Sequence, residues 1–153
     1  MGRRGFPARA GYVILAALAL SLVVASCGRA TPAAKQENLR ATILIQTGEM
    51  DSRWFRDVEV PRGTNAYELT EKVTKGELKA TYYPQFRTHF VDAIFGVSGK
   101  SPHFWLIFLW NDVEKRWESL PVGADLFSLK DGHVLAWYYV DTSQPGRVPP
   151  VTP

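Results

Sequence analysis

Residues 58–69 read Val58-Glu59-Val60-Pro61-Arg62-Gly63-Thr64-Asn65-Ala66-Tyr67-Glu68-Leu69, and the hydrophobic pattern changes its period within them. The segment Trp54–Val60 is typical of a strand, and the Pro-Arg-Gly that follows ends it. Asn65 and Glu68 then have the spacing of a capping box, and apolar residues recur after them at helical spacing. Gly76 is placed to end the helix. The sequence therefore predicts a strand, a stop and a helix over Asn65–Lys75.

Further strands are predicted on both sides of this helix. Leu39–Ile45 alternates apolar with polar or outward positions, as a half-buried strand does. Phe104–Trp110 is continuously apolar and aromatic, which predicts a central strand buried on both faces. Phe127–Leu129 leads into Lys130-Asp131-Gly132, which is a hairpin turn signal. The other predicted strands are Leu78–Tyr83, Thr88–Phe95 and Val134–Val140. This order of elements predicts an α+β fold with a mixed sheet packed on one helix.

The first 26 residues have the order of an export signal. A basic start is followed by an apolar run from Tyr12 to Val24 and by small residues that lead to the only cysteine, Cys27. The apolar run is short for crossing ~30 Å of hydrocarbon. Val24-Ala25-Ser26-Cys27 resembles the lipobox of prokaryotic lipoproteins, in which the cysteine is lipidated. We expect a signal peptide over 1–26 and a lipid anchor on Cys27, with an ordinary signal peptide or an uncleaved anchor as alternatives.

The composition of the two flanking segments sets the expected domain bounds. Residues 27–38 are rich in Ala, Pro and polar residues, and we interpret them as the lipidated cysteine and a tether. Residues 143–153 are rich in proline and have no core-facing pattern, which predicts a disordered tail. The folded domain is therefore expected over 39–142, on the extracytoplasmic side of the cell membrane. Arg3-Arg4-Gly5-Phe6 resembles a twin-arginine signal, so both the Sec and the twin-arginine export routes stay open.

The charge of the chain excludes one class of partner. Three of the 18 basic residues and none of the 15 acidic residues precede Cys27, so the chain from Cys27 onward is formally neutral. The basic isoelectric point therefore comes from the leader, and we expect no nucleic-acid partner. With no second cysteine, the domain depends on its apolar core and has no internal disulfide.

The residues that usually carry catalysis are sparse. The three histidines, His89, His103 and His133, have no spacing of metal ligands, whereas a zinc site needs three or four convergent ligands. Ser98 follows Gly96-Val97 but lacks the full nucleophile-elbow pattern, and no complete phosphate-binding loop occurs. We therefore expect neither a metal site nor an enzyme.

Aromatic residues crowd the second half of the domain, including Phe104-Trp105 and Trp137-Tyr138-Tyr139. Consecutive strand residues point to opposite faces, so these rings cannot all enter one core. Two readings stay open: the rings fill a core and a second covering layer, or some of them form a patch that faces a ligand or a partner.

Several segments together resemble a prokaryotic family of domains of unknown function that is likened to the C-terminal domain of transcobalamin and intrinsic factor. Residues 58–69 are similar to its opening of strand, Gly-Thr/Ser and helix. Residues 104–111 resemble its Trp-rich strand that ends in Asn. The remaining similar segments are 91–97, 121–125 and 129–132. They occur in the order of the family and cover nearly all of the expected domain.

This resemblance implies a β-grasp-like fold and a function in ligand binding. In the vertebrate carriers the related domain closes over one side of cobalamin, so a corrinoid is one small-molecule candidate here. A protein-interaction module that recognises an envelope protein is the alternative, and the domain is expected to be a monomer. If it binds a ligand, the expected contacts are Tyr82, Tyr83, Trp105, Trp110, Asn111 and Tyr139.

Overall fold

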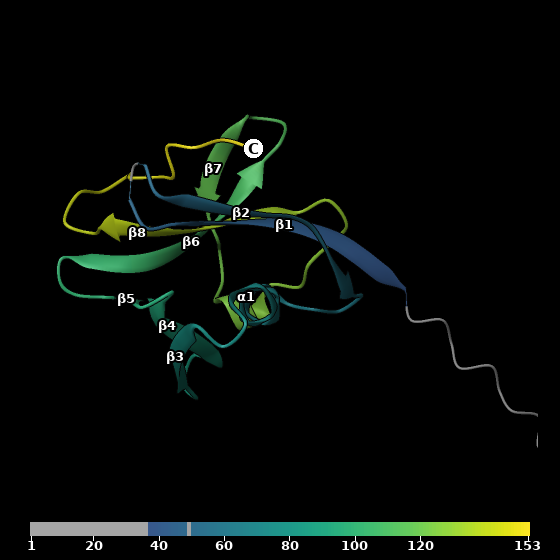
Figure 1. The fold of residues 1–153 in the computed structure, drawn as a ribbon, viewed down its shortest axis with the longest axis horizontal. Helices are drawn as coiled ribbons and strands as arrows, with labels where there is room; N and C mark the ends of the chain where they lie inside the picture. Colours follow the sequence, from purple (N-terminus) through teal and green to yellow (C-terminus); the bar gives the residue numbers. More distant parts are fainter. Residues whose placement is uncertain (1–36, 49) are drawn as a thin grey trace, which may run out of the picture. The chain divides into compact units, whose positions relative to one another are not determined.

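The computed structural model describes residues 37–48 and 50–153, so the expected signal peptide and Cys27 lie outside the described residues. All described residues belong to one compact unit. Its elements in chain order are β1 (Asn38–Gln46), β2 (Ser52–Pro61), α1 (Ala66–Thr74), β3 (Leu78–Tyr83), β4 (Thr88–Ile94), β5 (Val97–Ser98), β6 (His103–Asn111), β7 (Arg116–Ser119), the short 3₁₀ helix η1 (Ala124–Leu126) and β8 (Val134–Asp141) (Figure 1). No helix within these described residues is both long and apolar enough to cross a membrane.

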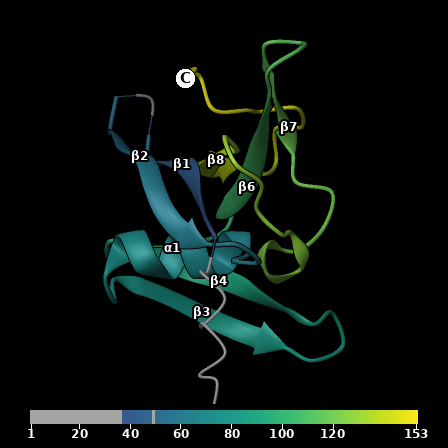
Figure 2. The same ribbon diagram turned by 90° about the vertical axis from the view of Figure 1, so that its right-hand side faces the viewer.

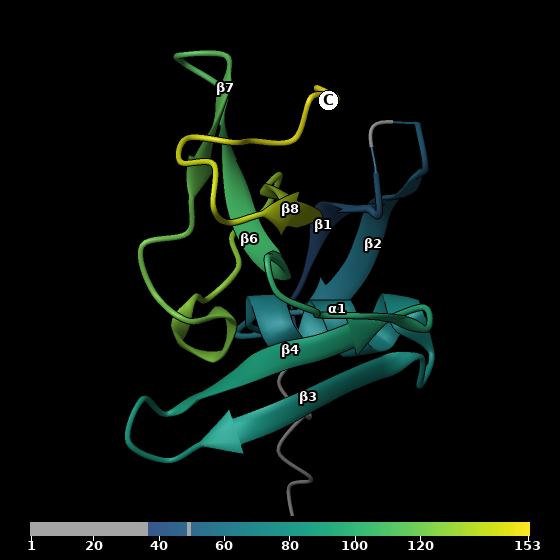
Figure 3. The ribbon, with the colours of Figure 1, turned by 90° about the vertical axis from the view of Figure 1, so that its left-hand side faces the viewer.

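Five of the strands form the larger sheet, in the order β2-β1-β8-β6-β7. β1 and β8 run parallel, and the other neighbouring pairs run antiparallel. α1 and the β3–β4 hairpin lie on the same side of this sheet (Figures 2 and 3). The predicted α+β fold, with a mixed sheet packed on one helix, is confirmed.

The helix begins and ends where the sequence predicted. The side chain of Asn65 accepts a hydrogen bond from the main-chain nitrogen of Glu68 at 2.8 Å, and the Glu68 carboxylate accepts one from Asn65 at 2.9 Å. Lys75 and Gly76 end the helix with φ of 51° and 93°, a left-handed conformation that glycine adopts without steric cost. The helix buries one face, which consists of Ala66, Leu69, Thr70, Val73 and Thr74.

Apolar side chains pack on both faces of the larger sheet. Trp137 belongs to the core cluster under α1, where its indole nitrogen donates a hydrogen bond to the Thr70 hydroxyl at 2.8 Å. Tyr138, the next residue, is buried in a second cluster on the opposite face with Phe108 and Trp117. Adjacent aromatic residues of β8 therefore serve two different clusters, as the alternation of a strand requires.

The C-terminal segment contacts the second cluster. The indole nitrogen of Trp117 donates a hydrogen bond to the carbonyl of Val151 at 2.8 Å, and Val151 packs against the same cluster. Pro149 is buried as well. These contacts are few and isolated, and the disorder predicted for residues 143–153 stays a prediction.

The smaller sheet has the order β3-β4-β5. Two side chains from the larger sheet form hydrogen bonds with β5 of this smaller sheet. The indole nitrogen of Trp105 donates a hydrogen bond to the carbonyl of Val97 at 2.9 Å, and the Tyr139 hydroxyl donates one to the carbonyl of Ser98 at 3.0 Å. The two sheets are thus joined at β5, while β4 and β6 frame an opening beside that junction.

Two predictions about strands were wrong. β6 is not buried on both faces, because β7 pairs only with its end, Phe108–Asn111, and Phe104 and Leu106 are exposed. Residues 127–129 form no hairpin with β8. Leu129 instead binds the carbonyl of Thr64 through its main-chain nitrogen, and β8 pairs in parallel with β1. The turn signal at 130–132 marks the entry into a parallel strand.

Candidate functional site

The main candidate site is an open groove of about 540 Å³ between β4 and β6. We call it the aromatic groove, and its lining residues are Tyr83, Phe86, Phe90, Val91, Asp92, Phe104, Trp105, Leu106 and Thr142. Five of these nine carry aromatic rings. A concave surface with mostly apolar side chains and few polar groups is typical of a binding site.

The β3–β4 hairpin supplies one wall of the groove. Tyr83 and Phe86 both place their rings against Phe90, with ring centroids 4.9 Å and 5.9 Å apart in edge-to-face arrangements. Phe86 and Phe90 are 56% and 51% exposed. Large apolar side chains that are clustered and this exposed on a small domain indicate an interaction site.

The opposite wall comes from the first half of β6. Phe104 and Leu106 are 44% and 40% exposed, whereas Trp105 between them is buried and points to the other face of the strand. Their exposure follows from the sheet topology, since β7 is too short to pair beside them.

Asp92 is the only charged residue in the groove lining. The hydroxyl of Thr81 donates a hydrogen bond to its carboxylate at 2.7 Å and so fixes its side chain from the neighbouring strand. A single anchored carboxylate among aromatic rings favours a ligand that carries a positive charge beside an apolar surface.

A polar cluster behind β4 holds this wall in place. Asp125 accepts hydrogen bonds from the Thr88 hydroxyl and from the main-chain nitrogen of His89, both at 2.7 Å. Burial alone would raise the pKa of Asp125, but these bonds and the nearby His89 ring lower its pKa below the ordinary value. The His89 ring stacks on Tyr67 of α1, with centroids 4.1 Å apart. Burial, together with the carboxylate of Glu71, raises the pKa of Tyr67 to about 12.

The structure brings together two of the six residues expected to contact a ligand. Tyr83 and Trp105 line the aromatic groove. Tyr82 points to the other side of β3, where its ring contacts His89. The ring of Tyr139 packs against Trp105, and its hydroxyl donates a hydrogen bond to the carbonyl of Ser98. Tyr139 therefore contacts a groove residue but does not line the groove.

The other two residues, Trp110 and Asn111, lie at the far end of β6. The ring of Trp110 packs edge-to-face on Trp117. The amide of Asn111 is used by its own turn, because its oxygen accepts hydrogen bonds from the main-chain nitrogens of Val113 and Glu114 and its nitrogen donates to Glu118, all at 3.0 Å.

The sequence reasoning missed the other seven groove residues, which are Phe86, Phe90, Val91, Asp92, Phe104, Leu106 and Thr142. The position of Phe90 could have been predicted from the alternation of side chains along a strand. Its neighbours His89 and Val91 face the helix and the core, respectively. Alternation alone would therefore have placed Phe90 on the outer face of β4. Nothing local shows that the first half of β6 lacks a strand beside it.

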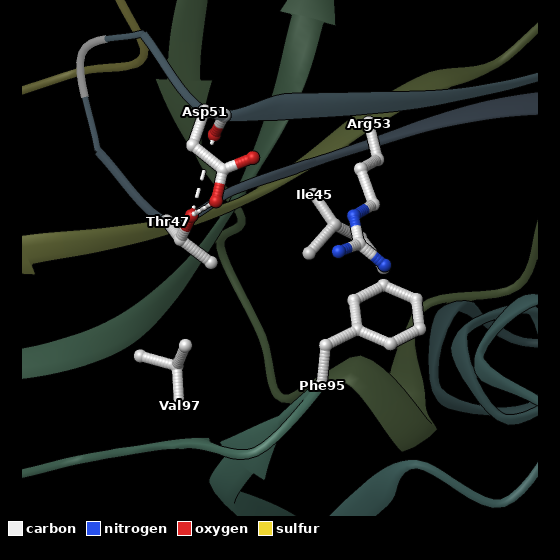
Figure 4. A pocket seen from close by; sticks show the side chains of 6 residues that line it. All are labelled: Ile45, Thr47, Asp51, Arg53, Phe95 and Val97. Carbon is white, nitrogen blue, oxygen red and sulfur yellow. Dashed lines mark hydrogen bonds between the residues drawn. The ribbon is translucent and has the colours of Figure 1, made fainter.

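Two other hollows have less capacity for a ligand. One lies under the β1–β2 hairpin, where the Arg53 guanidinium stands 4.6 Å from the centre of the Phe95 ring (Figure 4). Its volume is only about 40 Å³, enough for little more than water. The other, of about 340 Å³, is lined by polar and charged residues that include His103, Asp141 and Arg147.

Across residues 37–48 and 50–153, no three His, Cys, Asp or Glu side chains are grouped closely enough to hold a metal ion.

Comparisons with known proteins identify a shared fold. No family model and no curated protein match the sequence. Among solved structures, haptocorrin in complex with Cbi matches 69% of this chain with a TM-score of 0.58 and 14% identity. A proposed metal-binding protein from Ruminococcus gnavus ATCC 29149 matches 67% of the chain with a TM-score of 0.53 and 13% identity. The match covers 26% of the haptocorrin chain and 97% of the bacterial one. A transcobalamin-like fold, expected from the resemblance, is thereby supported.

Proposed function

We propose that this chain is a non-catalytic binding domain held outside the cell membrane by a lipid on Cys27, and that the aromatic groove is its binding site. One observation carries the assignment of the site: Phe86, Phe90, Phe104 and Leu106 expose large apolar surfaces around a single groove of about 540 Å³. Leaving such surface in water is unfavourable by about 25 cal/mol per Å², so a protein keeps it where an occupant covers it.

The membrane anchor rests on the sequence of the leader. A basic start, a short apolar run and a cysteine after small residues suit cleavage and lipidation at Cys27. Metabolic labelling with a palmitate analogue tests this step. We expect the label and the membrane retention to be lost in Cys27→Ser, while Ser26→Ala keeps both. Label that persists in Cys27→Ser would contradict the anchor.

Two classes of occupant suit the groove. The fold shared with haptocorrin makes a corrinoid the first small molecule to test, since a flat macrocycle with apolar faces would stack on the aromatic rings. An envelope protein is the alternative, because clustered and exposed aromatic rings also suit a protein hot spot.

Tryptophan fluorescence tests the groove directly. We would titrate fragment 33–153, the compact unit, with cobalamin and with a hydrophobic dye, correcting for inner-filter loss. Trp105 lies in the groove lining and serves as the reporter. We expect saturable quenching that weakens about tenfold or more in Phe90→Ser. The matched control is Val122→Ser, which changes an apolar residue of similar exposure outside the groove. Equal titrations for both variants and the parent chain would contradict the proposed site.

A further inference from the structure

We propose that the natural occupant of the aromatic groove is an extended peptide segment of a partner protein, which adds as a strand to the open edge of β6. The inference rests on the proposed function, because it names the class of ligand for the same groove. The main-chain groups at the edges of β6 and β4 support it, in addition to the apolar side chains of the groove.

The edge of β6 beside the groove has main-chain groups that point outward. His103 exchanges two hydrogen bonds with Lys100, and the carbonyl of Ile107 accepts one from the nitrogen of Leu120. Both residues therefore direct their main-chain groups away from β8. Main-chain groups alternate along a strand, so Trp105, midway between them, directs its N–H and C=O to the same side. Among the residues that the structure describes, no strand pairs with Trp105 on that side.

β4 presents a similar edge on the opposite wall. The main-chain nitrogen of His89 donates to the carboxylate of Asp125, so this residue points away from β3. Val91, two residues further on, has the same orientation and lines the groove. β5 pairs with β4 only at Ala93 and Ile94 and leaves Val91 uncovered on that side. Two strand edges with outward main-chain groups thus line one groove.

The open stretch of the β6 edge is short, because Lys100 binds His103 and the nitrogen of Leu120 binds the carbonyl of Ile107, but within that stretch no residue blocks pairing. Natural edge strands carry a lysine, a proline, an inward charge or a bulge that prevents pairing. Phe104-Trp105-Leu106 has none of these, and its register with β8 is unbroken. An apolar edge without a blocking residue is a surface on which a further strand can pair.

The side chains around the edge define the chemistry of the peptide. Residues of an added strand alternate between the two faces of the sheet, so apolar residues at every second position would reach Phe90, Phe104 and Leu106. Asp92 is the only charge in the lining, and it complements a lysine or arginine on the peptide. The partner segment is therefore an extended, alternating apolar sequence with one basic residue.

Binding of a synthetic library of short, capped peptides tests this proposal. The peptides alternate Val, Leu or Phe with Ser or Thr, and each carries one Lys or norleucine at the same position. We expect fragment 33–153 to select Lys peptides and the amide exchange of Trp105 and Val91 to slow about tenfold or more on binding. N-methylation should abolish binding at alternate peptide positions and be tolerated at those between them. Leu106→Lys should abolish binding, whereas Val122→Lys, of similar exposure, should not.

Asp92→Asn tests the proposed pairing of the Asp92 carboxylate with a basic residue of the peptide. We expect it to weaken the Lys peptide about threefold to fivefold and to leave the norleucine peptide unchanged. Strand addition would be overturned if N-methylated peptides bind as tightly as the parent peptides and the amides of Trp105 and Val91 are not protected from exchange. A dimer in sedimentation that Leu106→Lys dissociates would overturn it in favour of a second copy on this edge. If no peptide binds while cobalamin or the dye still does, the peptide proposal fails and the groove stands; if nothing binds, both proposals fail.

Discussion

The Nδ1 atom of His89 lies 2.7 Å from Oδ1 of Asp125, and this contact fastens β4 to η1. The same carboxylate also accepts the main-chain nitrogen of His89 and the hydroxyl of Thr88. Because β4 forms one wall of the aromatic groove, the orientation of that wall depends on Asp125. The cluster therefore links the stability of the domain to the geometry of its candidate site.

Replacing this carboxylate should produce a pH-dependent loss of stability. Hydrogen bonds that outweigh burial lower the pKa of Asp125 in the folded chain, so its stabilising effect is full above the ordinary value of 3.8. That effect disappears as the pH falls through 3.8 and below. We expect Asp125→Asn to lower the free energy of unfolding by about 1–3 kcal/mol at neutral pH. Urea unfolding over a pH series should show this difference shrinking in acid.

The control for this series is Asp112→Asn, because Asp112 forms an ion pair with Lys115 that is largely exposed. Exposed pairs contribute little, so the change in unfolding free energy should be much smaller than for Asp125→Asn. A constant penalty for Asp125→Asn from neutral pH to acid would show that the ionised carboxylate is not the source of the stabilisation.

Gly123 lies against the same cluster, and a larger residue there should disturb it. A Cβ atom at Gly123 would overlap the Thr88 hydroxyl oxygen, which donates to Asp125. We expect Gly123→Ala to lower the free energy of unfolding by about 1–3 kcal/mol, since overpacking displaces the threonine. Gly48→Ala is the matched control because no atom lies within 4 Å of its added Cβ. Equal unfolding curves for the two variants would refute the clash.

Local sequence signals account for most of the elements. The cap of α1 needs only Asn65 and Glu68 three residues apart, and the left-handed end needs only Gly76 next to it. Trp137 and Tyr138 could be assigned to opposite faces without knowledge of the sheet order. Such features depend on a few consecutive residues, so a single sequence was enough to predict them.

The site depends on relationships that span the chain. Phe104 and Leu106 became exposed because β7 is short and pairs elsewhere, which no residue of β6 indicates. Asn111 carries a ligand-type amide, yet that amide makes three hydrogen bonds within the β6–β7 hairpin. The composition indicated that aromatic side chains are the candidate ligand contacts. Only the sheet topology showed which of them line the same groove.

The buried contact between Trp137 and Thr70 gives a third stability prediction. The indole nitrogen donates to the Thr70 hydroxyl at 2.8 Å, and Thr70 is fully buried. Thr70→Val keeps the shape but leaves the indole N–H unpaired, so we expect a loss of about 1–3 kcal/mol in urea unfolding. Thr74→Val is the control, because the hydroxyl of Thr74 donates only to helix carbonyls. A smaller loss for Thr70→Val than for Thr74→Val would contradict this role.

The C-terminal segment should contribute to stability without contributing to the site. Deleting residues 143–153 removes the Val151 carbonyl that accepts the indole N–H of Trp117, together with the buried Pro149. We expect the truncated chain to lose about 1–3 kcal/mol of unfolding free energy. All nine residues of the aromatic groove remain in the truncated chain, and its affinity for groove ligands should therefore match that of the parent. A truncation that leaves stability unchanged would show that the segment only rests on the sheet.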